Sequence, residues 1–206
     1  MDVADKPAFP AEFQRHLAAL ESRYLAQSDP LRQSGYSGGA QRWQMERSPI
    51  LDAITGNGEL LEVGCANGYL LECLAQWGIA RGLGLTPWGV DLSAGLIEIA
   101  RHRLPQFREH FFVANAWDWI PPRRFRYVYA VCDCVPAAFL ERFMRDLMAN
   151  AVAPGGRLIL GAYGSRSRGE TPLPIHALLA SFGYKVRGTA AAGAPETARF
   201  AWVDGE

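Results

Sequence analysis

The residues with the clearest chemical potential lie in one segment, where an apolar run meets a glycine-bounded loop. The segment Leu60–Leu70 reads LLEVGCANGYL, so Glu62 and Gly64 end a candidate buried strand and Gly68 precedes a candidate helix. Glycines at these positions let the backbone approach a ligand across the strand end, with a helix N-terminus behind it. A dinucleotide fingerprint would read G-x-G-x-x-G, and the middle glycine is missing here. A pyrophosphate cradle is therefore disfavoured.

A second acid, Asp91, follows the next candidate strand, residues 84–90. A carboxylate at this place in an α/β fold accepts hydrogen bonds from ribose hydroxyls. A nucleoside without a pyrophosphate is therefore the expected ligand. The alternatives are structural: the glycines could serve only tight strand-to-helix packing, and Asp91 could be only a helix cap beside Ser93.

The elements that must position these residues follow from the hydrophobic pattern. From Glu59 onward, short apolar runs alternate with amphipathic helical segments. Strands are expected over residues 60–63, 84–90, 111–114, 127–132, 157–162, 184–186 and 198–203, and helices over 69–77, 93–104, 139–148 and 178–182. Such alternation predicts a mostly parallel sheet with helices on both faces, in which ligands bind beyond the carboxyl ends of the strands.

Composition narrows the function further. The chain has 206 residues, 49% hydrophobic and 20% charged, which is typical of one soluble globular unit. Lys plus Arg and Asp plus Glu number 21 each, so no basic surface for nucleic acid or an anionic membrane is expected. No apolar stretch approaches the length of a membrane span, and residues 1–5 lack a signal-peptide pattern, which predicts a cytoplasmic protein. The four cysteines lack zinc-site spacing, and no metal is expected.

Four motifs in order resemble the class I S-adenosylmethionine-dependent methyltransferases. They are Glu62–Gly68, Gly89–Ser93, Ala114–Ala116 and Ala153–Leu158. The resemblance covers residues 59–203 and implies a doubly wound, seven-stranded sheet of order 3-2-1-4-5-7-6, with the last strand antiparallel. It also implies a helical cap in residues 1–56, a Rossmann-like domain in residues 57–206, S-adenosylmethionine as cofactor, and methyl transfer to an O, N or C atom of a small molecule.

The same resemblance implies a set of cofactor contacts. The loop residues Gly64, Cys65, Ala66, Asn67 and Gly68 hold the methionine part, Asp91 the ribose, Leu92, Asn115, Ala116 and Trp117 the adenine, and Cys132 faces the methionine. Glu62 is a further cofactor-binding residue of this set. The family usually has an aspartate where Asn115 stands. The amide oxygen of asparagine can still accept a hydrogen bond from the adenine amine.

A glycine-rich segment, residues 34–39, precedes these motifs and is expected to be a mobile loop. Tyr36 lies within this segment and Trp43 follows it, and the two rings either lie against the positive sulfur of the cofactor or anchor the N-terminal helix to the core. Both alternatives remain open. Closure of this segment would exclude water from the site.

The acceptor side shows no clear acid–base pair. Asp133 and His176 are the weak candidates for a catalytic base. Orientation alone can supply much of the rate, so a base is not required. Two other functions stay open: a cofactor-binding protein without catalysis, and a nicotinamide-dependent oxidoreductase, which the missing glycine disfavours. The fourth strand ends in CDCVP rather than the Asn/Asp-Pro-Pro-Tyr pattern of nucleic-acid enzymes, which again favours a small acceptor.

Overall fold

The computed structural model describes residues 6–206, and residues 1–5, on which the expectation of no signal peptide rested, lie outside them. The strands are β1 (Gly58–Val63), β2 (Leu85–Asp91), β3 (Phe111–Val113), β4 (Phe125–Val131), β5 (Val152–Tyr163), β6 (Gly188–Ala192) and β7 (Ala198–Asp204). The α-helices are α1 (Ala11–Leu25), α2 (Pro30–Gln33), α3 (Ala40–Arg47), α4 (Tyr69–Ala80), α5 (Ala94–Arg103), α6 (Leu140–Asn150) and α7 (Ile175–Ser181). Short 3₁₀ helices include η2 (Ser48–Ala53) and η4 (Cys132–Cys134).

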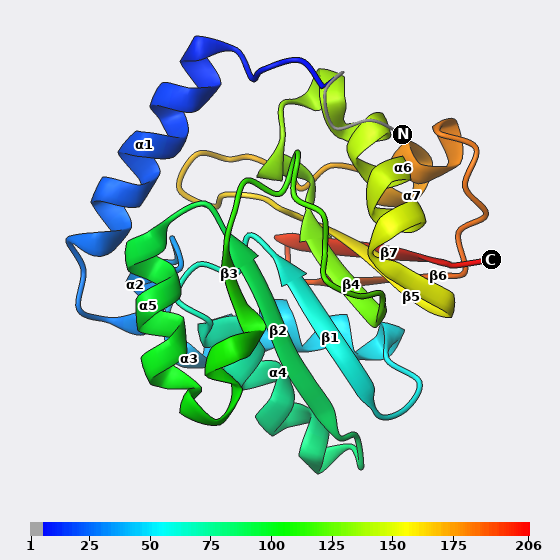
Figure 1. Ribbon diagram of the computed structural model, residues 1–206, viewed down its shortest axis with the longest axis horizontal. Helices are drawn as coiled ribbons and strands as arrows, with labels where there is room; N and C mark the ends of the chain where they lie inside the picture. The colour runs from blue at the N-terminus through cyan, green and yellow to red at the C-terminus, as the bar shows by residue number, and fades with distance from the viewer. Residues whose placement is uncertain (1–5) are drawn as a thin grey trace.

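The strands form one seven-stranded sheet of order β3-β2-β1-β4-β5-β7-β6, which confirms the expected topology. β7 runs antiparallel to both of its neighbours, and the other pairs are parallel. Because Val63 of β1 pairs with Val90 of β2 and with Ala130 of β4, the carboxyl ends of these three strands meet at one edge. Figure 1 shows α1 lying beyond that edge, past the arrowheads of β1 and β2.

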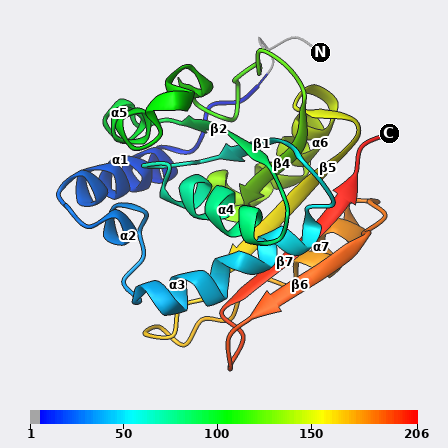
Figure 2. The ribbon, with the colours of Figure 1, turned by 90° about the horizontal axis from the view of Figure 1, so that it is seen from below.

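Two apolar layers cover the sheet, one on each face. One layer joins α4 and α5 to η2 through residues such as Leu71, Ile97 and Ile50. The other joins α6 and α7 through Phe143 and Leu179, and Figures 1 and 2 show these two helices on the opposite side from α4. Parallel strands buried on both faces have continuous apolar runs, as residues 127–131 of β4 do; in β1 the buried Glu62 interrupts the run.

Two expected strands differ from the structure, and one short helix was not predicted. The strand expected at residues 184–186 is wrong, because the chain pairs with β7 only from Gly188 onward. The strand expected at residues 157–162 begins earlier, at Val152, and the β4–β5 register shifts between Phe125 and Tyr127. Residues 30–33 form the short helix α2, whose N-terminus is capped by the Asp29 carboxylate accepting from the Arg32 amide at 2.9 Å.

The N-terminal helix α1 differs from an ordinary packed helix, since none of its residues is buried. Leu17, Leu20 and Tyr24 of its apolar face line a large cavity instead. The segment after α2 folds back tightly, because Tyr36 and Trp43 are both buried in the core layer of α4. Among residues 6–206, no helix is both long enough and apolar enough to cross a bilayer.

Candidate functional site

A cavity of about 1500 Å³ lies at the carboxyl edge of β1, β2 and β4. Its floor is formed by the ends of these strands, and α1, the segment of residues 34–47 and the loop of residues 163–170 enclose it. This is the place where ligands bind in doubly wound α/β folds. Of the expected site residues, the following line it: Tyr36, Trp43, Glu62, Gly64, Cys65, Ala66, Asp91, Leu92, Asn115, Ala116, Trp117 and Asp133.

The loop after β1 contains three residues with positive φ, a conformation that residues other than glycine rarely adopt. Gly64 has φ +79°, Ala66 φ +46° and Gly68 φ +71°. A Cβ atom on Gly64 would lie 3.0 Å from the sulfur of Cys134, so a larger residue there is excluded by space as well as by conformation. The amides of Gly64 and Cys65 both donate to the carbonyl oxygen of Val90, at 2.8 and 3.1 Å. The loop is therefore held against the end of β2.

Asp91 organises the loop as well as facing the cavity. One carboxylate oxygen accepts from the Ala66 amide at 2.8 Å, and the other accepts from the Ser93 amide at 2.9 Å. Burial raises the pKa of Asp91, and these two backbone hydrogen bonds oppose that shift. Each oxygen keeps a lone pair for a further donor. The N-cap of α5 is Ser93, whose hydroxyl accepts from the Leu96 amide at 3.2 Å, whereas Asp91 holds the Ser93 amide and keeps room for a hydroxyl ligand.

The residues after β2 and β3 form an open apolar wall. Leu92 is 54% exposed although it is a large apolar side chain, and it faces the cavity. The Asn115 side-chain oxygen accepts from the Trp117 amide at 3.1 Å, which fixes this turn. The indole nitrogen of Trp117 donates to the carbonyl of Pro7 at 3.0 Å, and its ring packs against Phe9. A planar apolar ligand would cover Leu92.

Glu62 is the most unusual polar group of the cavity. Its side chain is only 6% exposed, and its Oε2 atom has no hydrogen-bond partner among the described residues. Burial, followed by the charge of Asp91, raises the pKa of Glu62 well above its ordinary value, while Arg47 opposes the shift. Leaving a buried acceptor unsatisfied costs about 1–3 kcal/mol, so a donor at this position would be strongly favoured.

Arg47, which the sequence analysis missed, lies near Glu62 in the cavity wall. Its guanidinium lies 4.7 Å from the ring of Tyr36, 4.4 Å from Trp43 and 3.9 Å from Tyr163. Tyr36, which precedes α3, and Trp43, which lies on α3, therefore contact a cation of the chain itself, and they also anchor α3 to the core. The four-residue spacing of Trp43 and Arg47 on one helix face was the available signal.

Glu46 is the anionic partner of this cluster. Its carboxylate accepts from Arg42 at 2.7 Å, from Arg47 at 3.2 Å and from the Thr197 hydroxyl at 2.5 Å. Burial works against ionisation, but the hydrogen bonds from Thr197 and Arg42 hold the pKa of Glu46 below its usual value. One carboxylate thus faces two guanidinium groups, which leaves a net positive charge in this wall. An anion is the complementary ligand.

The ends of β4 and β5 form a further side of the cavity. The hydroxyls of Tyr129 and Tyr163 lie 2.7 Å apart. Asp133 follows β4 and faces the cavity. Burial raises the pKa of Asp133, and a hydrogen bond from its own backbone amide, followed by the charge of His16 on α1, opposes the shift. Asp133 is therefore an available hydrogen-bond acceptor beside the glycine loop.

Four expected site residues do not line the cavity, and each has a physical reason. Asn67 turns its side chain toward α2, and Gly68 allows close packing of α5, since a Cβ there would lie 3.0 Å from that of Ala100. Cys132 falls between Val131 and Asp133, which take the cavity-facing places. His176 is exposed on α7. Within residues 6–206, no three His, Cys, Asp or Glu side chains are grouped so that they could hold a metal ion.

Comparison with known proteins agrees with this geometry. Residues 60–156 match the family model described as "Methyltransferase domain". A stretch of 110 residues is 31% identical to the ribosomal protein L11 methyltransferase of Xylella fastidiosa (strain Temecula1), covering 53% of this chain and 33% of that protein. The match therefore spans about a third of the length of that curated relative.

Solved structures share the fold. Magnesium protoporphyrin IX methyltransferase from Synechocystis PCC 6803, solved with bound S-adenosylmethionine, matches with a TM-score of 0.60 and 15% identity, over 98% of this chain and 100% of that one. A DhpI complex with S-adenosylhomocysteine matches with a TM-score of 0.62 and 19% identity, over 92% and 95%. Residues 60–156 therefore match a methyltransferase domain, and the described chain has the fold and the strand order of these S-adenosylmethionine-dependent methyltransferase structures.

Proposed function

We propose that this protein transfers a methyl group from S-adenosylmethionine to an O, N or C atom of a small molecule. The observation that carries the proposal is the buried Glu62 carboxyl, which lacks a donor within the described residues and lies beside a positive-φ glycine loop. The ammonium group of a methionine would supply that donor. The residues present therefore fit the cofactor.

The remaining cofactor contacts divide among the walls already described. Arg47 would bind the methionine carboxylate, because Glu46 balances only one of the two charges of Arg42 and Arg47. Glu62 and Arg47 together would then recognise a zwitterion. Asp91 would accept hydrogen bonds from the ribose hydroxyls, and Leu92 would be covered by the adenine. When bound, the cofactor supplies an activated methyl group. The protein's own task is to orient the two reactants and to exclude water.

The elements that would orient the reactants and exclude water are α1, the lid segment, which we define as residues 30–47, and the region of Asp133. α1 and residues 34–47 of the lid segment border the cavity from the N-terminal side of the chain. Asp133 lies near Cys134, whose sulfur donates to the Val63 carbonyl at 3.4 Å beside Gly64. Asp133 would accept the proton of an N–H or O–H acceptor group. Division of the chain into a cap, residues 1–56, and a Rossmann-like domain, residues 57–206, is part of this proposal.

A small acceptor is favoured over a macromolecule by enclosure and charge. The reacting end of the cavity lies beneath α1, the lid segment and the loop of residues 163–170. The net charge of zero provides no general attraction to nucleic acid. Because the Xylella relative is named for ribosomal protein L11, a protein acceptor is the second candidate. A cytoplasmic location remains a proposal from the sequence.

Calorimetry and turnover together test the proposal. Purified protein should bind S-adenosylhomocysteine with a Kd in the micromolar range, on the order of −8 kcal/mol, and should not bind NAD⁺. Release of S-adenosylhomocysteine is then measured over a library of small amines, phenols and carbon acids, with ribosomal protein L11 as a separate arm. Binding of NAD⁺ alone would indicate an oxidoreductase. Cofactor binding without turnover in either arm would indicate a non-catalytic binding protein, and turnover of L11 alone would move the acceptor to proteins.

A further inference from the structure

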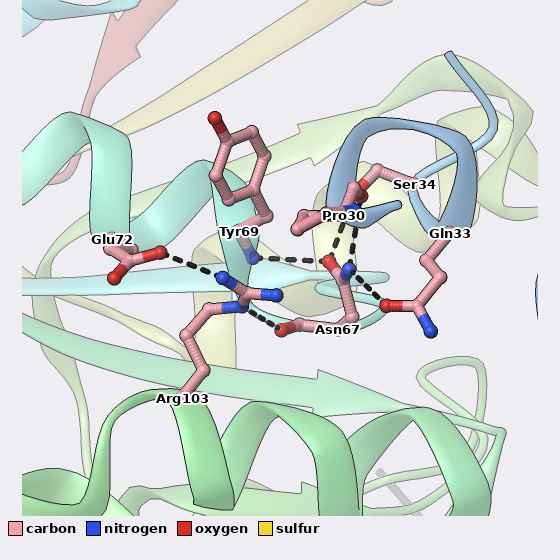
Figure 3. Close-up of polar contacts among 7 residues, drawn as sticks. All are labelled: Pro30, Gln33, Ser34, Asn67, Tyr69, Glu72 and Arg103. Atoms are coloured by element: carbon pink, nitrogen blue, oxygen red, sulfur yellow. Dashed lines mark hydrogen bonds and ion pairs between the residues drawn. The ribbon is translucent and has the colours of Figure 1, made fainter. Parts of the chain in front are cut away.

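The sequence places Asn67 in the cofactor loop, yet its side chain points away from the cavity and into the N-terminal segment (Figure 3). Its Nδ2 atom donates to the Pro30 carbonyl at 3.0 Å and to Oε1 of Gln33 at 3.1 Å. Its Oδ1 atom accepts from the Ser34 hydroxyl at 2.9 Å and from the Tyr69 amide at 3.1 Å. A primary amide offers two donors and two acceptors, so this fully buried side chain uses its whole capacity.

Three of these four bonds join two separate walls of the cavity. Asn67 follows Ala66, which lines the cavity and donates to Asp91. Gln33 ends α2, and the chain then continues through Ser34 to the cavity-lining Tyr36. Neither Asn67 nor Gln33 lines the cavity itself. The amide therefore connects the cofactor loop to the lid segment from behind.

The main chain of Asn67 is held independently of α2. Arg103 of α5 donates from Nε to the Asn67 carbonyl oxygen at 3.0 Å, and its NH1 atom pairs with Glu72 of α4 at 2.9 Å (Figure 3). The guanidinium also lies 5.1 Å from the ring of Tyr69. The loop position is thus fixed by α4 and α5. Among the hydrogen bonds of residues 6–206, those that join this loop to residues 30–34 all come from the Asn67 side chain.

From this geometry we propose that Asn67 is a positioning residue that couples the cofactor loop, residues 64–68, to residues 30–38 of the lid segment. A ligand held by the loop then also orders the wall formed by Tyr36, so that cofactor binding shapes the acceptor side of the cavity. The inference rests on the proposed function for the choice of ligand. The coupling itself is a property of the hydrogen bonds between the two segments.

The bond pattern makes an isosteric substitution diagnostic. Asn67→Asp keeps the size and the two acceptors but removes both donors, so that oxygens would face the Pro30 carbonyl and Oε1 of Gln33. Rotation of the Gln33 amide would not repair this without loss, because its Nε2 atom already donates to the Gln27 carbonyl at 2.7 Å. Gln33→Met removes the same acceptor from the α2 side and leaves the cofactor loop unchanged.

Hydrogen exchange followed by mass spectrometry tests the coupling, with and without S-adenosylhomocysteine. In the wild type, the ligand should slow exchange at least tenfold in residues 64–68 and in residues 30–38. In Asn67→Asp and in Gln33→Met, protection should remain at 64–68 and be lost at 30–38, and Kd should rise several-fold. The matched control is Arg103→Met, which loosens the same loop from its other side. It should lower the unfolding midpoint while both segments keep their ligand-dependent protection.

Two results would overturn the proposal. One is wild-type protection of residues 64–68 without protection of 30–38. The other is unchanged protection of 30–38 in both Asn67→Asp and Gln33→Met. If the ligand slows exchange nowhere in the wild type, the proposed cofactor is wrong instead. The coupling is then judged in the ligand-free protein, where Asn67→Asp must accelerate exchange of 30–38 and Arg103→Met must not.

Discussion

Glu62→Gln should separate recognition of the methionine ammonium from every other feature of the cavity. The substitution keeps the shape of the side chain and removes its ability to become an anion. A hydrogen bond to a charged group contributes about 1.5–3 kcal/mol, so the Kd for S-adenosylhomocysteine should rise roughly 10- to 150-fold. The affinity for 5′-methylthioadenosine, which lacks the amino-acid part, should not change.

The pH dependence gives a second, independent signature. Since the pKa of Glu62 is raised well above its ordinary value, the free protein keeps a proton there up to a higher pH than an ordinary carboxyl does, and below that raised pKa an incoming ammonium must displace the proton. Wild-type affinity should therefore fall as the pH is lowered through that raised pKa, by up to about tenfold per unit. Glu62→Gln should lack this part of the pH dependence. Calorimetry in buffers of different ionisation enthalpy would report the released proton directly.

The stability of the ligand-free protein should change with pH in the direction opposite to the affinity. Some groups have a higher pKa in the folded protein than in the unfolded chain. Such a carboxyl lowers the free energy of unfolding as the pH rises from the pKa of the unfolded chain, about 4.3, to the pKa of the folded protein. Glu62→Gln removes this loss, so urea unfolding at pH 7 should show the ligand-free variant to be at least as stable as the wild type. The matched control is Glu59→Gln on the same strand, whose carboxylate instead pairs with Arg123 at 2.7 Å. Binding within twofold of wild type, with the same pH slope, would refute the role of Glu62.

Further substitutions address the other walls. Arg47→Met should weaken S-adenosylhomocysteine binding by about 1.5–3 kcal/mol in calorimetry and leave 5′-methylthioadenosine unaffected, and equal losses for both ligands would contradict a carboxylate contact. Asp91→Ala should cost about 1–3 kcal/mol of binding and also some unfolding free energy, because the Ala66 amide loses its acceptor; stability loss with normal binding would leave only a cap. Asp133→Asn should retain cofactor affinity and abolish the rise of turnover with pH through the raised pKa of Asp133, so an unchanged pH–rate profile would exclude it as the base. Turnover should survive EDTA, and recovery only with added Mg²⁺ would reveal a metal requirement.

Much of the fold was accessible from local patterns. The apolar runs of β1 and β4, the capped start of α5 at Ser93 and the glycine-bounded loop after β1 are all short-range signals, and the structure has each element there. The strand order came from the family resemblance, because local patterns do not state which strands pair. β6 was misplaced for a related reason: its sequence GTAAA has no apolar alternation, and only its pairing with β7 makes it a strand.

The candidate site likewise contains residues that local sequence patterns predicted and residues that they did not. Positions dictated by backbone conformation, such as Gly64 with φ +79°, and acids at strand ends, such as Asp91, were recognisable from residue type and spacing. Arg47 was not, because its role depends on rings from Tyr36 and from Tyr163, which is 116 residues away along the chain. Asn67 was assigned to the cavity because the loop contains it, and its direction follows from contacts with α2. Requirements on backbone conformation are local and restrict the residue type, so they can be recognised in the sequence. The direction and the charge environment of a side chain arise only when distant segments pack together.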